Sequence, residues 1–276
     1  MSYGVLYDGT RCIGCRACSV ACKSWNQNPA ELEKEPSVEG GIEGKAVVSD
    51  KTFTFMRYRE IGEGDEFKWA FAKIQCMHCL KPGCETACIV GALRRSEETG
   101  AVTYDTNKCI GCRYCMVACP FGIPTYQWEE RMPWIRKCTF CADRLNEAEN
   151  GMMPACATAC PTGALKFGER EALIEEAHSR IETSKTTDPA GVGKYFDHVY
   201  GEKEVGGTAW MYISSVDMTE LGLPGLSEEP VVKNARTAMG LLPYYATGML
   251  ALMAGIYFIT KRKQKIAAGK HEEKKG

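Results

Sequence analysis

Every cysteine of this chain belongs to one of four short groups. The 16 cysteines are Cys12, Cys15, Cys18 and Cys22; Cys76, Cys79, Cys84 and Cys88; Cys109, Cys112, Cys115 and Cys119; and Cys138, Cys141, Cys156 and Cys160. The first and third groups have the spacing C-x2-C-x2-C-x3-C, a run that holds cubane iron–sulfur clusters through cysteine thiolates. Four quartets of thiolates predict four [4Fe–4S] clusters, with these 16 cysteines as the iron ligands.

Two other uses of cysteine compete with this interpretation. Structural zinc takes two C-x2-C pairs separated by a longer stretch, so that four sulfurs surround one ion, and the compressed runs here would crowd it. Disulfide frameworks belong mainly to small secreted domains, whereas a chain of 276 residues that is 45% hydrophobic can build its own core. Iron–sulfur binding is therefore the prediction, and a zinc-stabilised scaffold at a membrane is the remote alternative.

The four groups form two repeated types. Residues 5–22 align with residues 102–119 around the first and third groups, and residues 84–93 align with residues 156–165 around the second and fourth. Internal repeats set the architecture of a chain. A two-cluster unit needs one group of each type, because each cluster takes three cysteines from one group and the fourth from its partner group.

The positions of the groups along the chain indicate how they pair. The second and third groups are joined by the Gly91–Tyr104 stretch, whose Thr99-Gly100 turn predicts a β-hairpin. These two groups should form one unit, which leaves the first and fourth to form the other. The crossed rule then predicts four ligand sets: Cys12, Cys15 and Cys18 with Cys160; Cys138, Cys141 and Cys156 with Cys22; Cys76, Cys79 and Cys84 with Cys119; and Cys109, Cys112 and Cys115 with Cys88.

The predicted fold class is α+β, with two ferredoxin-like two-cluster units, an inserted loop and hairpin, and one C-terminal transmembrane helix. The expected parts are residues 1–25 with 136–182 for the first and fourth groups, 74–135 for the second and third, 26–73 for the inserted loop and β-hairpin, 183–235 for an extended connector, 236–261 for the transmembrane helix, and 262–276 for a basic cytoplasmic tail.

The segments without cysteines carry weaker signals. Residues 26–50 are rich in Glu, Gly and Pro and predict an irregular loop. The runs Thr52–Arg59 and Phe67–Ile74 alternate apolar and polar residues and predict a hairpin, which either contacts a partner subunit or covers a cluster. The spacing of apolar residues over Glu169–Ile181 predicts a surface helix, to which we assign no chemistry.

Four single residues have two interpretations each. Lys23 follows Cys22 and either shifts the potential of a cluster or is a solvated surface lysine. Trp128 and Trp134 lie either at a protein interface or against a core. His78, inside the second group, is either a functional proton-carrying or haem-adjacent residue or a hydrogen-bond partner near a cluster.

The C-terminal region predicts membrane attachment. The stretch from Thr237 to Thr260 is uncharged and long enough to span a bilayer, and Tyr244 and Tyr257 near its ends suit the interfacial belts. Basic residues crowd residues 261–265, so the positive-inside rule places the tail in the cytoplasm. The cluster-binding domain would then lie on the outer, periplasmic face of the cytoplasmic membrane.

Several function classes are disfavoured. A net charge of −1 predicts no nucleic-acid binding, and no P-loop, dinucleotide-binding loop or Ser/His/Asp arrangement is present. We therefore expect no catalysis by the isolated chain. No apolar signal or twin-arginine pair precedes Cys12, so the domain is expected to cross the membrane folded, together with a partner that carries a signal.

The motifs resemble a known family. The order of the four groups, the Cys12–Cys18 start, the Gln75–Cys79 segment, the Cys109–Pro120 run and the late Gly206-Gly207-Thr208 segment are similar to the iron–sulfur β subunits of membrane-bound respiratory oxidoreductases. A single C-terminal transmembrane helix points to the formate dehydrogenase N/O type or to the hydrogenase-2 type. The Tyr200–Glu204 and Met116–Cys119 segments are similar to the latter, and the absent export signal favours the former.

The resemblance implies a function in respiratory electron transfer. A catalytic subunit, with molybdenum or tungsten in the formate dehydrogenase type or nickel–iron in the hydrogenase type, would deliver electrons one at a time. Four clusters would relay them to an integral membrane subunit, either a cytochrome b or a haem-free protein, that reduces quinone. Related nitrate reductase subunits replace one cysteine and hold a [3Fe–4S] cluster. All 16 cysteines are present here, so the resemblance also implies four [4Fe–4S] clusters.

Overall fold

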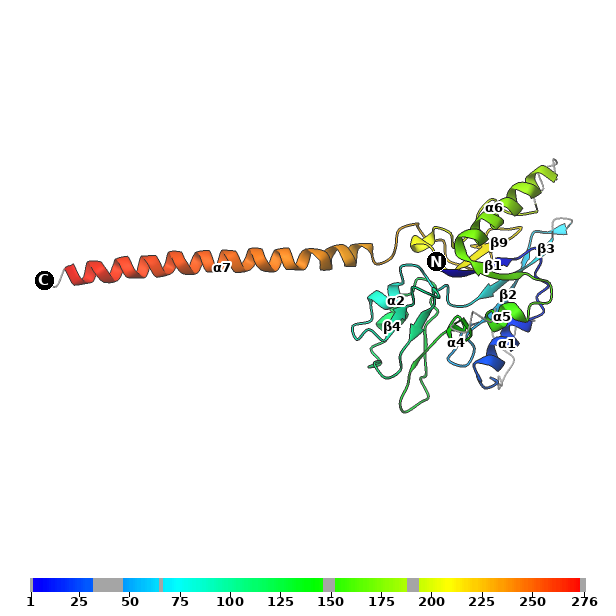
Figure 1. Cartoon of the computed structure of the whole chain (residues 1–276), viewed down its shortest axis with the longest axis horizontal. Coiled ribbons are helices and arrows are strands. Elements are labelled where there is room, and N and C mark those ends of the chain that lie inside the picture. The colour runs from blue at the N-terminus through cyan, green and yellow to red at the C-terminus, as the bar shows by residue number, and fades with distance from the viewer. Residues whose placement is uncertain (1, 32–46, 65–66, 146–151, 188–193, 274–276) are drawn as a thin grey trace. The chain divides into compact units, whose positions relative to one another are not determined.

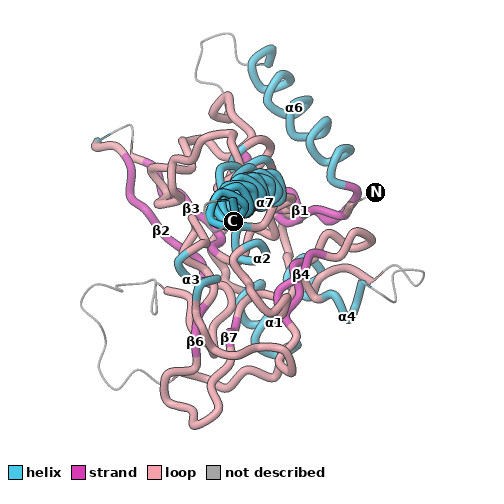
Figure 2. The backbone as a smooth tube through the Cα atoms, turned by 90° about the vertical axis from the view of Figure 1, so that its left-hand side faces the viewer, coloured by secondary structure: helices cyan, strands magenta, loops and turns pink. Residues whose placement is uncertain are grey.

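The computed structural model describes residues 2–31, 47–64, 67–145, 152–187 and 194–273. The chain divides into two compact units, Met1–Val231 and Val232–Gly276. The first is a mixed α/β unit of small sheets and mostly short helices, and the second is a helix (Figures 1 and 2).

The largest sheet of the first unit is built around the first strand of the chain. It has the order β8-β1-β9, in which β1 (Tyr3–Asp8) pairs antiparallel with β8 (Leu165–Glu169) and parallel with β9 (Trp210–Ile213). Strands far apart in the chain therefore meet in one sheet. Residues 5–7 of β1 are buried, as expected for a central strand that is covered on both faces.

One face of this sheet is covered by helix α6 (Arg170–Thr187). Its apolar residues recur at helical spacing and pack against the sheet residues of the same cluster, which comprises Leu6, Leu173, Ile174, Ala177, Ile181, Val199, Met211 and Ile213. The helix predicted over Glu169–Ile181 is thus confirmed, and it continues six residues further because polar residues extend it into solvent.

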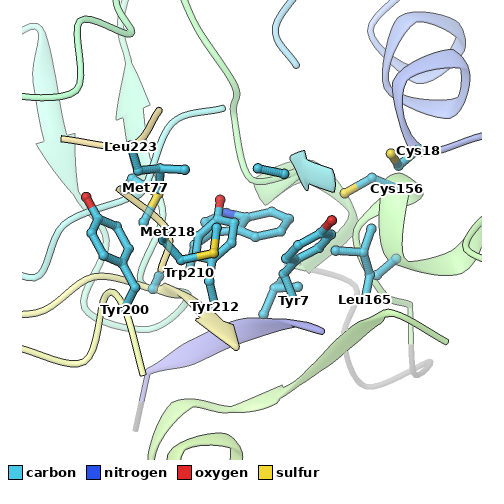
Figure 3. Packing of buried hydrophobic residues seen from close by; sticks show 14 of the residues in the cluster. Tyr7, Cys18, Met77, Cys156, Leu165, Tyr200, Trp210, Tyr212, Met218 and Leu223 are labelled. Atoms are coloured by element: carbon cyan, nitrogen blue, oxygen red, sulfur yellow. The ribbon is translucent and has the colours of Figure 1, made fainter. Parts of the chain in front are cut away.

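The other face carries the main core. Tyr7, Trp210 and Tyr212 project from β1 and β9 into this core, close to Cys18 and Cys156 (Figure 3). The Tyr7 and Tyr212 rings lie 5.3 Å apart, and Trp210 lies 6.4 Å from Tyr212. The alternation of strand side chains thus directs the aromatic residues toward the cysteines and the aliphatic ones toward α6.

Three further hairpins surround this sheet. Strands β2 (Phe55–Ile61) and β3 (Lys68–Ile74) pair antiparallel, as do β4 (Leu93–Arg95) and β5 (Val102–Tyr104), and both predicted hairpins are confirmed. The third, formed by β6 (Thr125–Tyr126) and β7 (Ile135–Arg136), was not predicted because its strands are only two residues long.

Short helices bring the cysteine groups together in pairs. Helix α1 (Ala17–Trp25) contacts α5 (Ala155–Thr158), and α2 (Gly83–Thr86) contacts α3 (Tyr114–Val117). A single turn, α4 (Ala142–Leu145), follows Cys141, and a 3-10 turn covers Glu204–Gly206. The first group therefore lies beside the fourth, and the second beside the third.

One expected segment differs in detail from the structure, and another lies partly outside the described residues. The connector expected over residues 183–235 contains the end of α6 and strand β9, which completes the central sheet. Its parallel partner β1 lies about 200 residues earlier, a separation that no local pattern reveals. Within the loop predicted over residues 26–50, residues 32–46 lie outside the described part of the chain.

The second unit contains helix α7 (Lys233–Glu273), which includes Pro243. Proline has no N–H group, so one helical hydrogen bond is absent at this position. Separately, the Thr247 hydroxyl donates to the Pro243 carbonyl at 3.0 Å. The segment Gly240–Ile266 is long and apolar enough to cross a membrane, and its side chains are exposed within the chain. The apolar segment predicted over 236–261 is thus a helix, and the helix continues into the basic tail.

Gly201 provides a test of the core beside the sheet. Its φ of 94° is one that residues with a side chain rarely adopt, and an added Cβ would overlap the Trp210 carbonyl oxygen and lie 2.6 Å from the Thr208 hydroxyl. We expect Gly201→Ala to destabilise the full chain by about 2 kcal/mol or more in thermal unfolding. In Gly64→Ala, the matched control, φ is 59° and the added Cβ meets no atom within 4 Å. Equal losses in both variants would contradict this packing.

Candidate cluster-binding sites

Four predicted ligands line one cavity in the first unit. Cys12, Cys15 and Cys18 come from the loop after β1 and from the start of α1, and Cys160 follows α5. The cavity is also lined by Tyr7, Met56 and Lys73, among other residues. The structure therefore brings together three cysteines of the first group and the last cysteine of the fourth.

A second set lies around Cys22, one helical turn after Cys18 in α1. Burial raises the pKa of the Cys22 thiol to about 12, and the charges of Cys156 and Cys141 add to this rise. The pKa of Cys138 lies well above its ordinary value, first because the thiol is buried and then because of Cys22 and Cys76. Cys22 therefore lies near the cysteines of the fourth group, in agreement with the contact between α1 and α5.

The second group pairs with the end of the third. Burial raises the pKa of Cys79 well above its ordinary value, with further contributions from Cys76, Cys119 and Cys84. Burial likewise raises the pKa of Cys84 to about 12, and Cys76 and Cys119 act in the same direction. Cys119 is therefore the neighbour of three cysteines from the second group.

The third group forms the remaining set. Burial raises the pKa of Cys115 to about 11, and Cys109, Cys112 and Cys88 raise it further. Cys88 of the second group therefore lies near the third group, and the division of the 16 cysteines into four ligand sets stays a prediction. Buried thiols with such pKa values are protonated at neutral pH, and a metal that binds them must displace their protons.

Backbone geometry repeats at the cysteine loops. Gly14 and Gly111 have φ values of 67° and 71°, and the residues before α1 and α3, Arg16 and Arg113, have φ values of 61° and 64°. An added Cβ at Gly14 would lie 2.8 Å from Tyr58. The loops thus need glycine, both for its conformation and for the close approach of a covering aromatic ring.

Backbone amides point at the sulfurs from within these loops. The N–H groups of Gly14 and Gly111 donate to the sulfurs of Cys12 and Cys109 at 3.5 and 3.4 Å, respectively. Phe140 donates to Cys138 in the same way at 3.4 Å. Amide donors stabilise a thiolate and tune the potential of a cluster that it ligates.

His78 and Phe140 occupy equivalent positions in the second and fourth groups. Both have positive φ values, 47° and 60°, and their rings are 4.8 Å apart. The Val102 N–H donates to His78 Nδ1 at 2.9 Å, so the proton of the neutral ring lies on Nε2. Burial holds the pKa of His78 well below its ordinary value. The ring is therefore neutral, which fits a hydrogen-bonding role rather than proton transfer.

The donors present fit an iron–sulfur cluster. Among the described residues, no three His, Cys, Asp or Glu side chains converge closely enough to share one metal ion. Around a single zinc the four sulfurs would lie roughly 3.8 Å apart, whereas a cubane binds each cysteine at a separate iron atom. His78 Nε2 is buried and has no partner within the described part of the chain, so its N–H is available to a cluster sulfur.

The hairpin of β2 and β3 covers the first group. Met56 contacts Cys18 with 3.7 Å between their sulfurs, the Tyr58 hydroxyl donates to the Gly14 carbonyl, and Arg16 donates to the Tyr58 hydroxyl at 2.9 Å. The structure therefore supports the covering role of the hairpin, and contact with a partner subunit stays a prediction.

The other singled-out residues lie at the surface. Lys23 donates to the carbonyl groups of Pro29 and Lys51 and lies 3.7 Å from a carboxylate oxygen of Glu31, so it ties a loop in place. Trp128 is 66% exposed and Trp134 is 41% exposed. Neither tryptophan fills a core, and an interface role for them stays a prediction.

Sequence reasoning missed two buried lysines, Lys73 and Lys137. They are 1% and 5% exposed. Lysine is seldom buried, and in the alternation of β3 the buried alanines Ala70 and Ala72 place Lys73 on the opposite face. No pattern in the sequence therefore marks either lysine as an interior group.

The hydrogen bond between His78 and Val102 can be tested by mutation. His78→Phe resembles the fourth group, which has Phe140, but it leaves the buried Val102 N–H without an acceptor. We expect it to destabilise the full chain by about 1–3 kcal/mol in thermal unfolding. His178→Phe, at a 53% exposed side chain, should change stability by less than about 1 kcal/mol. A His78→Phe chain as stable as the original would refute the bond.

Comparisons with known proteins support the binding of 4Fe-4S clusters by this chain. Two family models, each described as a 4Fe-4S dicluster domain, match residues 67–170 and 11–92. The chain is 43% identical over 277 residues to a protein of Nitratidesulfovibrio vulgaris, which covers 99% of this chain and 70% of that protein.

Two further relatives have informative names. The hydrogenase-2 operon protein HybA of Shigella flexneri is 34% identical over 284 residues, covering 96% of this chain and 85% of that protein. The iron-sulfur subunit of the nitrate-inducible formate dehydrogenase of Escherichia coli is 36% identical over 256 residues, covering 92% of this chain and 82% of that subunit.

Proposed function

This chain belongs to the family of iron–sulfur proteins that includes formate dehydrogenase iron-sulfur subunits and HybA, and we propose that it relays single electrons through four [4Fe–4S] clusters. It is an electron-transfer subunit of the formate dehydrogenase or hydrogenase-2 type. The proposal is that its electrons come from a catalytic subunit and leave to a membrane subunit that reduces quinone.

The cavity that contains Cys12, Cys15, Cys18 and Cys160 carries the proposal. These four thiols come from opposite ends of the cysteine-containing region and meet without any other metal-binding group among the residues that line the cavity. The same crossed arrangement in the three other gatherings supports two ferredoxin-like units, each with two clusters. We assign the 16 cysteines to the four ligand sets on this basis.

The neighbours of Cys138 support one order of the clusters. Cys138 belongs with Cys22 in one unit, yet its thiol is also influenced by Cys76 of the other unit. We propose that the Cys138 set and the Cys76 set form the link between the two units. In this proposal the Cys12 set and the Cys109 set lie at the two ends of a linear path.

The polypeptide has two tasks in such a relay. A bound cluster accepts and releases one electron at a time, without making or breaking a bond to substrate. The amides of Gly14, Gly111 and Phe140 stabilise the ligating sulfurs. The hairpin of β2 and β3 and the aromatic core keep water away from the inner sulfurs, and this low polarity strengthens every nearby charge.

The apolar part of α7 supports a membrane location. We propose that it spans the cytoplasmic membrane once, with the basic residues 261–265 on the cytoplasmic side and the cluster domain on the outer face. The proposed partners are a molybdenum or tungsten catalytic subunit and an integral quinone-reactive subunit. The similarity to HybA over 96% of the chain keeps a nickel–iron partner as the second candidate.

Double substitutions test the crossed ligand sets. Cys160→Ser should remove or convert one cluster, and adding Cys12→Ser should leave the other three clusters intact, because both residues ligate the same cluster. Adding Cys138→Ser instead should affect a second cluster and roughly double the loss of iron, as measured with acid-labile sulfide in the purified complex. The opposite pattern would assign Cys160 to the Cys138 set and refute the crossing.

A charge in the apolar segment tests the membrane proposal. Leu252→Arg places a cation near its centre, at a cost of about 2.5–3.5 kcal/mol for insertion, and we expect a smaller fraction of the chain in alkaline-washed membranes. Gln264→Arg adds the same charge among the basic residues and should leave that fraction unchanged. If Leu252→Arg stays in the membrane as the original chain does, α7 is not the anchor.

A further inference from the structure

Lys73 is a cation inside the core of the first unit. It lies on β3 opposite Met56 of β2 and is 1% exposed. Its ammonium donates to the Thr54 hydroxyl at 2.9 Å and to Gln75 Oε1 at 3.0 Å, and it lies 4.5 Å from the centre of the Trp210 ring. All of these partners are neutral.

A buried ammonium needs negative charge nearby, because it has lost its water. The ion pairs of the described residues include no carboxylate partner for Lys73. The groups around it that can carry negative charge are cysteines. It lines the cavity that contains Cys12, Cys15, Cys18 and Cys160.

Lys73 also faces the second ligand set of the same unit. Its charge acts on Cys22 and Cys138 as well as on Cys18 and Cys156. Cys18 and Cys156 share the core cluster of Trp210, the ring over which the Lys73 ammonium lies. Burial lowers the pKa of Lys73, and negative charge on the four cysteines, as in ligating thiolates, raises this pKa. One ammonium is therefore shared between two ligand sets.

Lys137 occupies the reciprocal position. It directly precedes Cys138 of the fourth group, yet its ammonium donates to the Val102 carbonyl of β5 and to the Cys138 carbonyl at 3.1 Å. Val102 packs in one buried cluster with Cys84 and Cys115 of the second and third groups, so this ammonium lies beside that cluster, and its charge lowers the pKa of Cys84. Each lysine precedes a cysteine group of one unit and places its charge beside sulfurs of the other.

We propose that Lys73 is a fixed positive charge that raises the reduction potentials of the two clusters held by the first and fourth groups. This inference rests on the proposed function, since it requires clusters at these cysteines. One electron entering a cluster adds one negative charge, with no bond or proton transferred. The ammonium stabilises that reduced form, strongly so in a core of low polarity, and Lys137 does the same beside Cys84.

The hairpin of β2 and β3 therefore has a second role, which is to hold the Lys73 ammonium in place. Its strand β3 holds Lys73 against Trp210 and Gln75, and the Gln75 side chain donates to the Tyr212 hydroxyl, which in turn donates to the Lys73 carbonyl at 3.0 Å. These contacts fix the position of the ammonium relative to the core. Lys73 is not an iron ligand, and it acts on the electron carriers through its charge.

Redox titration of the purified complex, followed by electron paramagnetic resonance, tests this role. Lys73→Gln keeps a hydrogen-bonding side chain but removes the charge. We expect the transitions of the affected clusters to move to lower potential by at least a tenfold change in the oxidised-to-reduced ratio, or about 59 mV for a one-electron couple. Lys73→Arg should keep the original potentials. Unchanged potentials in Lys73→Gln would overturn the inference.

Three controls make the result specific. Lys166→Gln removes a 52% exposed lysine of β8 and should shift no transition. Thr54→Asp leaves Lys73 in place but neutralises it from 2.9 Å, so it should shift the same transitions downward even if Lys73→Gln fails to assemble. An assembled Thr54→Asp complex without a shift would overturn the inference. Lys137→Gln should move a different transition, and a shift of the same one would contradict the reciprocal arrangement.

Iron and sulfide content separates this inference from the proposed function. An original complex without iron at this chain would refute the proposed function itself. If the complex has its full iron content but its reduction potentials are the same with and without the charge of Lys73, the proposed relay stands. Only the role of the lysine is then refuted.

Discussion

The contact between distant cysteine groups is the constraint on which the rest of the first unit depends. Helix α1 meets α5 and α2 meets α3, so that each gathering of thiols joins segments from separate parts of the chain. Folding buries seven of the 16 cysteines. Burial raises the pKa of the Cys18, Cys22 and Cys84 thiols, so the fold alone does not favour their thiolate forms. Metal binding and folding are therefore coupled, because the ligands must lose their protons when the metal enters.

Much of this arrangement could be predicted because it is encoded locally. Cysteine spacing, the repeated segments and the turn at Gly100 are short-range patterns, and they led to the paired groups and both hairpins. Strand β9 could not be foreseen, since its parallel partner is far away in the chain and no turn connects them. Lys73 was missed for a different reason, because lysine on a strand normally faces solvent.

Cysteine groups of the same type are alike in their backbone but differ in side-chain chemistry. Gly14 and Gly111 have nearly the same φ, as do Arg16 and Arg113. His78 of the second group, however, faces Phe140 of the fourth, so only one of these two side chains offers an N–H. The repeated scaffold sets where the sulfurs lie, and such single replacements give clusters of the same type different surroundings and hence different potentials.

The most direct test of the account is the metal content of the native complex, purified anaerobically from detergent-solubilised membranes through a tag on this chain. The account predicts about 16 irons per copy of this chain beyond those of its partners, with molybdenum or tungsten in the formate dehydrogenase type or nickel in the hydrogenase type. Stoichiometric zinc with little iron would contradict the electron relay.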